Sequence, residues 1–249
     1  MSQSMEMSYL PLILFTALSF TSLAFSGFGG IIIAIALGVF FYPIKTMLPI
    51  LVPLTLLANS YLFIRYHRFI DKKLLFKTIF PLMILGLLTG IYLFDTMHGD
   101  HLKRIFALIV ILISSKELYR NIHQRPEPAS LSKPRSFIYI FGAGVVQGIF
   151  SSGGPLLVYV ISKMNLTKAV FRSTLIPVWL VSNTILTTSY IFTDRIDYST
   201  VRLSLMLIPS VIIGLGLGSF LHQRINEKGF KTAINILLLL SGCLMLVVK

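Results

Sequence analysis

Two short runs of serine and glycine interrupt long apolar stretches of this chain. Residues 150–155 read FSSGGP, and residues 26–30 carry a partial copy, SGFGG. Glycine and serine disfavour a helix and proline suits the first turn of a new one, so each run is expected to break a helix. The first N–H groups of a helix that restarts there are unpaired and attract an anion. The candidate anion-binding residues in the two runs are Ser26, Gly27, Gly29, Gly30, Ser151, Ser152, Gly153, Gly154 and Pro155.

The second run predicts the more detailed site. We expect the helix that restarts at Pro155 to hold the anion, with the hydroxyls of Ser151 and Ser152 and the amides of Gly153 and Gly154 as donors. The competing interpretation is that the glycines only let helices pack closely.

Three further residues join the candidate set. Asn59 and Asn183 each lie six residues after a proline, in the apolar run that follows each break. We expect them to brace the breaks or to form hydrogen bonds between helices. Arg172 lies at the start of an apolar run, where it supplies a cation to the site or anchors the helix to lipid headgroups.

The ionisable residues argue against catalysis and against a metal site. All 9 aspartates and glutamates and all 5 histidines fall in connecting segments or near the ends of apolar runs. A proton relay or a metal site built on buried carboxylates is therefore hard to assemble. The single cysteine, Cys243, excludes an intramolecular disulfide. We expect no catalytic residues, no metal and no cofactor.

Composition predicts the class of protein. The 249 residues are 55% hydrophobic and only 12% charged, with a mean hydropathy of +0.83. Several apolar runs reach the roughly 18–20 residues that span a bilayer, which predicts an all-α polytopic membrane protein. The formal charge of +13 would suggest nucleic acid in a soluble protein, but these basic residues lie between apolar runs, where they meet anionic lipid. We expect the bilayer and a small anion as partners, and no nucleic acid.

The chain divides into two related halves. Residues 50–59 align without a gap on residues 174–183, and the same offset superimposes Gly29 and Gly30 on Gly153 and Gly154. We expect a first transmembrane repeat over residues 1–119, a basic cytoplasmic linker over 120–135 and a second repeat over 136–249. Each repeat has four segments and opens with a broken or re-entrant helix. The expected segments cover residues 9–42, 47–63, 74–94 and 102–118, then 137–162, 173–192, 201–221 and 230–248.

The basic residues favour re-entrant hairpins over single broken helices. If each broken stretch is a hairpin, 16 of the 22 lysines and arginines fall on one face of the membrane, whereas single crossing helices place only 13 there. The positive-inside rule then predicts a cytoplasmic linker, with both termini outside. Three crossings and a hairpin in each half predict that the repeats are inverted relative to each other.

These motifs together resemble the TauE/SafE family of sulfite and sulfonate exporters. The resemblance rests on the paired glycine runs, the asparagine in the second span of each half and the basic loop that ends in Ile70 and Asp71. It implies transport of small sulfur-containing anions, such as sulfite, thiosulfate or organosulfonates, across a prokaryotic inner membrane. Ile31 departs from the pattern, because a further glycine or proline is expected there. An anion channel remains an alternative, and a polytopic membrane enzyme is a weaker one.

Overall fold

The computed structural model describes residues 9–26, 30–66, 70–123, 131–162, 164, 166, 168–224 and 227–247. All regular elements in these ranges are helical, which confirms the predicted all-α class. The helices are α1 (Tyr9–Ser26), α2 (Gly30–Gly38), α3 (Ile44–Tyr66), α4 (Lys72–Leu74), a π-helical turn (Leu75–Ile79), α5 (Phe80–Thr96), α6 (Gly99–His123), α7 (Lys133–Phe150), α8 (Gly154–Ser162), α9 (Lys168–Phe192), α10 (Tyr198–Arg224) and α11 (Glu227–Val247).

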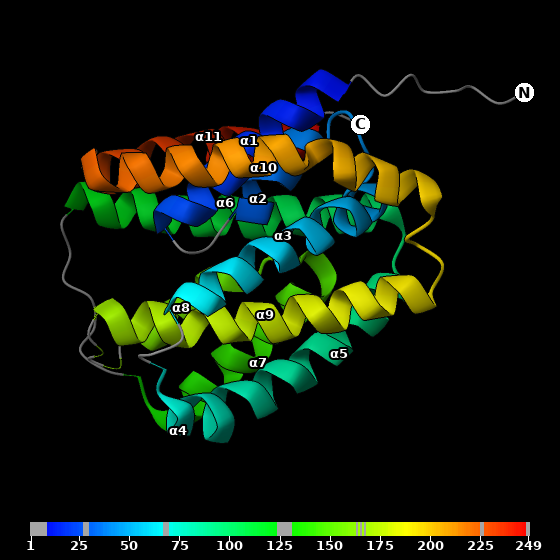
Figure 1. The fold of residues 1–249 in the computed structure, drawn as a ribbon. Helices are drawn as coiled ribbons and strands as arrows, with labels where there is room; N and C mark the ends of the chain where they lie inside the picture. Colours follow the sequence, from blue (N-terminus) through cyan, green and yellow to red (C-terminus); the bar gives the residue numbers. More distant parts are fainter. Residues whose placement is uncertain are drawn as a thin grey trace, which may run out of the picture.

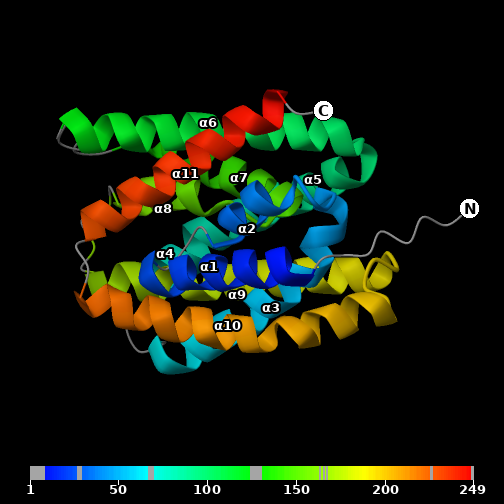
Figure 2. The same cartoon turned by 90° about the horizontal axis from the view of Figure 1, so that it is seen from above.

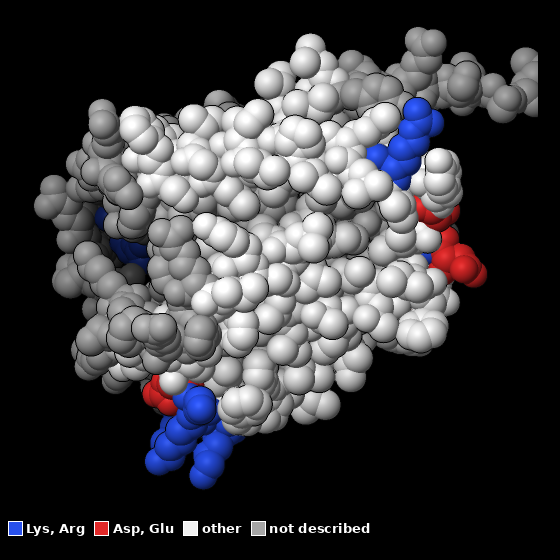
Figure 3. All heavy atoms as spheres, viewed as in Figure 1, with Lys and Arg blue, Asp and Glu red and all other residues white. Residues whose placement is uncertain are grey.

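The outer surface fits a membrane. Within the described residues, four helical segments are long and apolar enough to cross a bilayer, namely Ile44–Ile64, Lys72–Thr96, Ser173–Phe192 and Tyr198–Leu221. Large apolar side chains such as Leu112, Ile138 and Phe192 are exposed on the helix surfaces. Figure 3 shows that the described charged residues on this face lie only at its two ends. The chain is therefore a multi-pass membrane protein.

The first broken stretch folds back on itself as a helical hairpin. Gly30, at the start of α2, lies against Ser19 and Leu23 of α1, whereas Gly38, at the end of α2, lies near Phe15. The contacts thus move backwards along α1 as the chain moves forwards along α2. The two arms run antiparallel, as the hairpin prediction requires.

The second broken stretch has the same form. Gly153 lies against Ala143, and the rings of Tyr159 and Tyr139 are 5.4 Å apart near the other end of the pair. α8 therefore runs back along α7. The helices also extend beyond the expected segments, because α6 continues to His123 and α7 begins at Lys133. Both ends of the predicted linker are helical for this reason, and residues 124–130 lie outside the described range.

The ends of the helices lie on two opposite sides of the bundle. α1 begins and α11 ends towards the same side, whereas α3, α6 and α10 end on the opposite side (Figures 1 and 2). α3 and α9 cross in the middle of the bundle, and each follows one of the hairpins (Figure 1). This arrangement brings the starts of α2 and α8 towards the two central helices.

Glycines allow two pairs of helices to pack at backbone distance. A Cβ atom on Gly90 of α5 would lie 2.3 Å from the carbonyl oxygen of Val145 in α7. A Cβ atom on Gly218 of α10 would lie 2.2 Å from the carbonyl oxygen of Thr21 in α1. No side chain fits at either position. The four-residue spacing of Gly86 and Gly90 predicts such contact from the sequence, and Gly214 and Gly218 have the same spacing. The structure confirms close contact at both pairs.

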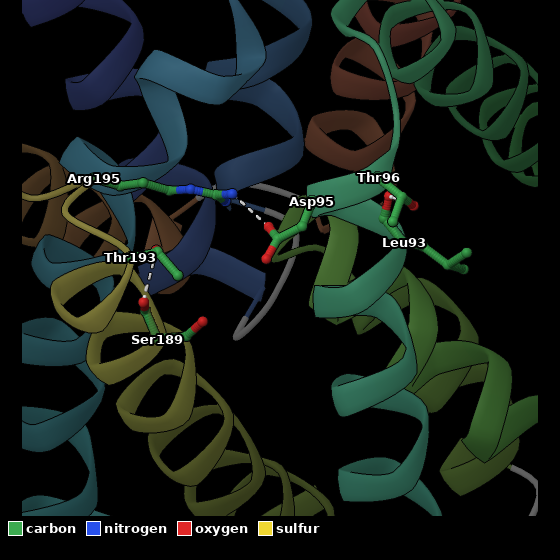
Figure 4. Close-up of polar contacts among 6 residues, drawn as sticks. All are labelled: Leu93, Asp95, Thr96, Ser189, Thr193 and Arg195. Carbon is green, nitrogen blue, oxygen red and sulfur yellow. Dashed lines mark hydrogen bonds and ion pairs between the residues drawn. The ribbon is translucent and has the colours of Figure 1, made fainter.

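An ion pair joins distant segments at the side where the chain begins. Arg195, in the loop after α9, pairs with Asp95 near the end of α5 (Figure 4). The guanidinium carbon of Arg195 also lies 4.8 Å from the centre of the Phe94 ring. Thr193 and Thr96 bond only to carbonyls of their own helices, those of Ser189 and Leu93 (Figure 4). Arg195 therefore provides the long-range contact at this side.

Candidate binding site at the helix breaks

A small cavity lies where the starts of α2 and α8 meet α3 and α9. Its volume is ≈ 40 Å³. A water molecule needs roughly 10–15 Å³ on the same measure, so the space corresponds to about three waters. The cavity is lined by Leu23, Gly30, Ile31, Thr55, Asn59, Gln147, Ser151, Ser152, Gly154, Trp179 and Asn183.

Most lining residues come in pairs, one from each half of the chain. Leu23 pairs with Gln147, Gly30 with Gly154, Thr55 with Trp179 and Asn59 with Asn183, and each pair is separated by 124 positions. This is the offset at which residues 50–59 align with residues 174–183. Equivalent positions of the two halves thus face one cavity, although the side chains differ at two of the four pairs.

In the second half, side chains hold the helix break in place. Ser151 adopts a left-handed backbone conformation with φ of 49°, which ends α7. The Gln147 Nε2 group donates to Asn183 Oδ1 at 3.2 Å and to Ser151 Oγ at 3.3 Å. Ser151 Oγ donates to Asn183 Oδ1 at 3.1 Å, and the Gly153 N–H donates to Gln147 Oε1 at 2.9 Å. All four residues are buried, so this network stabilises one geometry of the turn.

Three other buried polar atoms at the cavity have no hydrogen-bond partner among the described residues. They are Asn59 Nδ2, Ser152 Oγ and Trp179 Nε1. Their residues are only 1%, 6% and 6% exposed. An amide NH₂ and an indole N–H are donors only, and a hydroxyl also donates. A buried donor without an acceptor costs about 1–3 kcal/mol, so this set is complementary to a ligand rich in acceptor oxygens.

Two helix N-termini reinforce the same preference. α2 begins at Gly30 and α8 at Gly154, and both glycines line the cavity. The N-terminus of a helix carries a partial positive charge and unpaired N–H groups. Among the residues that the structure describes, no lysine or arginine lines the cavity. The cavity therefore offers neutral donors and helix dipoles, which suit a small oxyanion.

The structure brings together part of the predicted site. Gly30, Asn59, Ser151, Ser152, Gly154 and Asn183 line the cavity. Pro155 is the second residue of α8 and is half-buried. The backbones of Ser26 and Arg172 belong to α1 and α9, and their side chains lie outside the described residues, as do Gly27 and Gly29 altogether.

Two of the predicted donors already have partners within the protein. The Gly153 amide bonds to Gln147, and the Ser151 hydroxyl bonds to Asn183. These two hydrogen bonds hold the turn. The cavity atoms without partners among the described residues lie on Ser152, Asn59 and Trp179. Thr184, a polar residue next to Asn183 in α9, is exposed and bonds to the Leu180 carbonyl of its own helix.

Gln147 and Trp179 were missed by the sequence analysis. Gln147 stands four residues before Ser151, so the helical repeat places both on one face of α7. Trp179 is the only tryptophan of the chain, and its equivalent in the first half is a threonine. Each residue lies four positions before a predicted site residue, Gln147 before Ser151 and Trp179 before Asn183. This helical spacing is the signal that could have found them.

Comparison with known proteins gives one match. The model of a protein family described as sulfite exporter TauE/SafE matches residues 12–245. This range contains both hairpins, both central helices and every residue that lines the cavity. No curated protein and no solved structure matches the chain.

Proposed function

The chain belongs to the TauE/SafE sulfite exporter family, a family of membrane transporters, and on this premise we propose that it moves a small sulfur oxyanion across a prokaryotic inner membrane. The observation that carries the proposal is the group of buried donors without partners, Asn59 Nδ2, Ser152 Oγ and Trp179 Nε1, at one cavity. Sulfite and thiosulfate present several acceptor oxygens on one sulfur. Such a ligand would satisfy the donors together.

The proposed transport route depends on two inverted repeats, residues 1–119 and 136–249. Repeated contacts support this part of the proposal. Gly90 meets Val145 in the same way that Gly218 meets Thr21, and in each case the contact joins the third of the four segments of one half to the hairpin of the other. Asp71 and Asp197 each cap the helix that follows, accepting from the amide three residues on at 2.9 and 2.8 Å. A repeat axis in the membrane plane would pass near the cavity.

The proposed orientation has residues 63–77 and 120–135 in the cytoplasm and both termini outside. The excess of basic residues supports it. Cysteines introduced at Ser4 and Ser130 would test it in a Cys243→Ser background, which removes the exposed native thiol. An impermeant thiol reagent added outside should label position 4 and spare position 130. Labelling of position 130 from outside would reverse the proposed orientation.

Flux measurements would test the proposed substrate class. Proteoliposomes containing the full chain should take up radiolabelled sulfite faster than empty liposomes, and unlabelled thiosulfate should compete. The Asn59→Ala variant should reduce sulfite uptake by about tenfold, since a hydrogen bond to a charged ligand is worth about 1.5–3 kcal/mol. Sulfite uptake equal to that of empty liposomes would contradict the proposal.

A channel remains the second candidate, because neutral donors also suit an anion pore. Counterflow separates the two mechanisms. Unlabelled sulfite inside the vesicles should accelerate entry of labelled sulfite through a carrier, whereas an open pore shows no such stimulation. We propose the carrier, since the cavity holds only about three waters and binds its contents closely.

A further inference from the structure

Trp179 combines two properties, and no other described residue at the cavity has both. Its side chain is the largest at the cavity, and its indole nitrogen is a buried donor without a partner among the described residues. An indole N–H cannot accept a hydrogen bond, so it needs an acceptor atom in the cavity, and an oxygen of a bound anion would supply one. Trp179 therefore bears on both the chemistry and the size of the ligand.

The equivalent residue of the first half has neither property. Thr55 is much smaller, and its hydroxyl already donates to the Leu51 carbonyl at 2.9 Å. Thr55 is also buried, with 6% of its surface exposed, as for Trp179. The two sides of the cavity thus differ. Trp179 presents a bulky ring whose donor has no partner among the described residues, whereas Thr55 presents a small side chain whose donor is occupied.

Packing holds the Trp179 ring in its position. The ring belongs to the same buried apolar cluster as Met83 of α5 and Val160 of α8. A ring fixed from behind cannot retreat without opening a gap in a closely packed core. The ring therefore forms a firm wall of a cavity of ≈ 40 Å³.

We propose that Trp179 is the specificity-determining residue of the site, donating to the anion through Nε1 and excluding organic sulfonates through its ring. This inference rests on the proposed function. Sulfite and ethanesulfonate present similar oxygens but differ in the carbon chain on sulfur. A wall that limits the cavity to about three waters accepts the compact ion and rejects the chain.

Two substitutions separate the donor from the wall. Trp179→Phe removes the N–H and keeps most of the ring, whereas Trp179→Thr copies Thr55 and opens the wall. Thr184→Val is the matched control on the same helix, because the exposed Thr184 hydroxyl donates to the Leu180 carbonyl and Thr184 is not among the residues that line the cavity. The purified full chain would be titrated calorimetrically with sodium sulfite and with sodium ethanesulfonate.

The proposal predicts a different result for each variant. Trp179→Phe should weaken sulfite binding about tenfold, as expected for one hydrogen bond to an anion. Trp179→Thr should raise the affinity for ethanesulfonate relative to sulfite by at least about tenfold. Thr184→Val should leave this ratio within about twofold of the wild type.

Each contrary outcome has its own meaning. Wild-type sulfite affinity in Trp179→Phe would overturn the donor role, and an unchanged ligand ratio in Trp179→Thr would overturn the wall. Both results leave the proposed function intact, whereas a wild-type protein that binds neither anion refutes the proposed function itself. If Trp179→Thr does not fold, Trp179→Leu opens the wall less severely and is judged by the same ratio.

Discussion

The two halves of the chain place the same amide at the cavity and use it differently. Asn183 accepts hydrogen bonds from Gln147 and Ser151, and this network holds the turn of the second hairpin. Asn59 is equally buried, yet its Nδ2 group has no partner among the described residues. Leu23 occupies the position equivalent to Gln147 and cannot bond to Asn59.

The exchange of Gln147 for Leu23 at equivalent positions therefore distinguishes the two asparagines. Asn183 has a structural role, whereas the Asn59 amide is available to a ligand. A binding site at a helix break needs a rigid break to position the helix N-terminus and a free donor to bind the ligand. We infer that the second half supplies the rigidity and that the first half supplies the free amide. The predictions below test where the halves are equivalent and where they differ.

The largest effect is expected where the halves are equivalent, at the glycine contacts. Gly90→Ala and Gly218→Ala each force a Cβ against a carbonyl oxygen of the facing helix, at 2.3 and 2.2 Å. Backbone cannot move aside cheaply, so each should lower the free energy of unfolding by more than about 3 kcal/mol. Folded yield and thermal midpoint in detergent would measure it.

A control for these variants is Gly216, which lies on the same helix as Gly218, α10. Gly216→Ala meets nothing within 4 Å and should leave stability unchanged or raise it by up to about 1 kcal/mol. A large loss in only one of the two contact variants would break the equivalence of the halves. Equal tolerance of all three would refute the close contacts.

The next largest effect concerns the network around Gln147. Gln147→Leu copies Leu23 of the first half and leaves the Gly153 N–H without its acceptor. Buried groups that lose partners cost about 1–3 kcal/mol each, so we expect a loss of about 2–4 kcal/mol in stability together with loss of sulfite flux. A stable Gln147→Leu variant with normal flux would show that the second half does not need its network.

The paired asparagines should separate stability from binding. Asn59→Ala should weaken sulfite binding about tenfold with a thermal midpoint close to that of the wild type. Asn183→Ala should lower both, because it also removes the acceptor of Gln147 and Ser151. Identical profiles for the two variants would contradict the division of roles.

The smallest effect is expected at the exposed ion pairs. Asp95→Asn breaks the pair that ties α5 to the loop after α9, and Glu117→Gln breaks a local pair with Arg120 within α6. Partly exposed pairs contribute about 0–1 kcal/mol and weaken with salt. Asp95→Asn should lower the thermal midpoint slightly more than Glu117→Gln at low salt, and the difference should vanish in molar salt. A salt-independent loss would point to the Phe94 ring contact instead.

Local signals explain which parts of the fold were predictable. Glycine, serine and proline act on the backbone where they stand, so the helix breaks at Gly30 and Gly154 followed from the sequence, as did the close approach at Gly90. The charge count favoured hairpins because basic residues remain on one face. These features depend on few neighbours.

The hydrogen-bond partners were not predictable in the same way. Ser151 and Gly153 were expected to face a ligand, but the turn after α7 brings both within reach of Gln147 and Asn183. That geometry depends on the left-handed residue at Ser151 and on the approach of α9. Trp179 was missed because a lone tryptophan in an apolar run usually indicates packing, and only the cavity reveals its free N–H.

The central claim is that an oxyanion binds at the donors Asn59, Ser152 and Trp179, and the single tryptophan allows a direct test. The wild-type chain, labelled with ¹⁵N-tryptophan, should give one indole N–H resonance. Titration with sodium sulfite should move this resonance downfield and saturate, because the indole donates to the bound anion, whereas sodium chloride of equal ionic strength should not move it. An indole resonance that stays in place at sulfite concentrations that drive flux would contradict the claim.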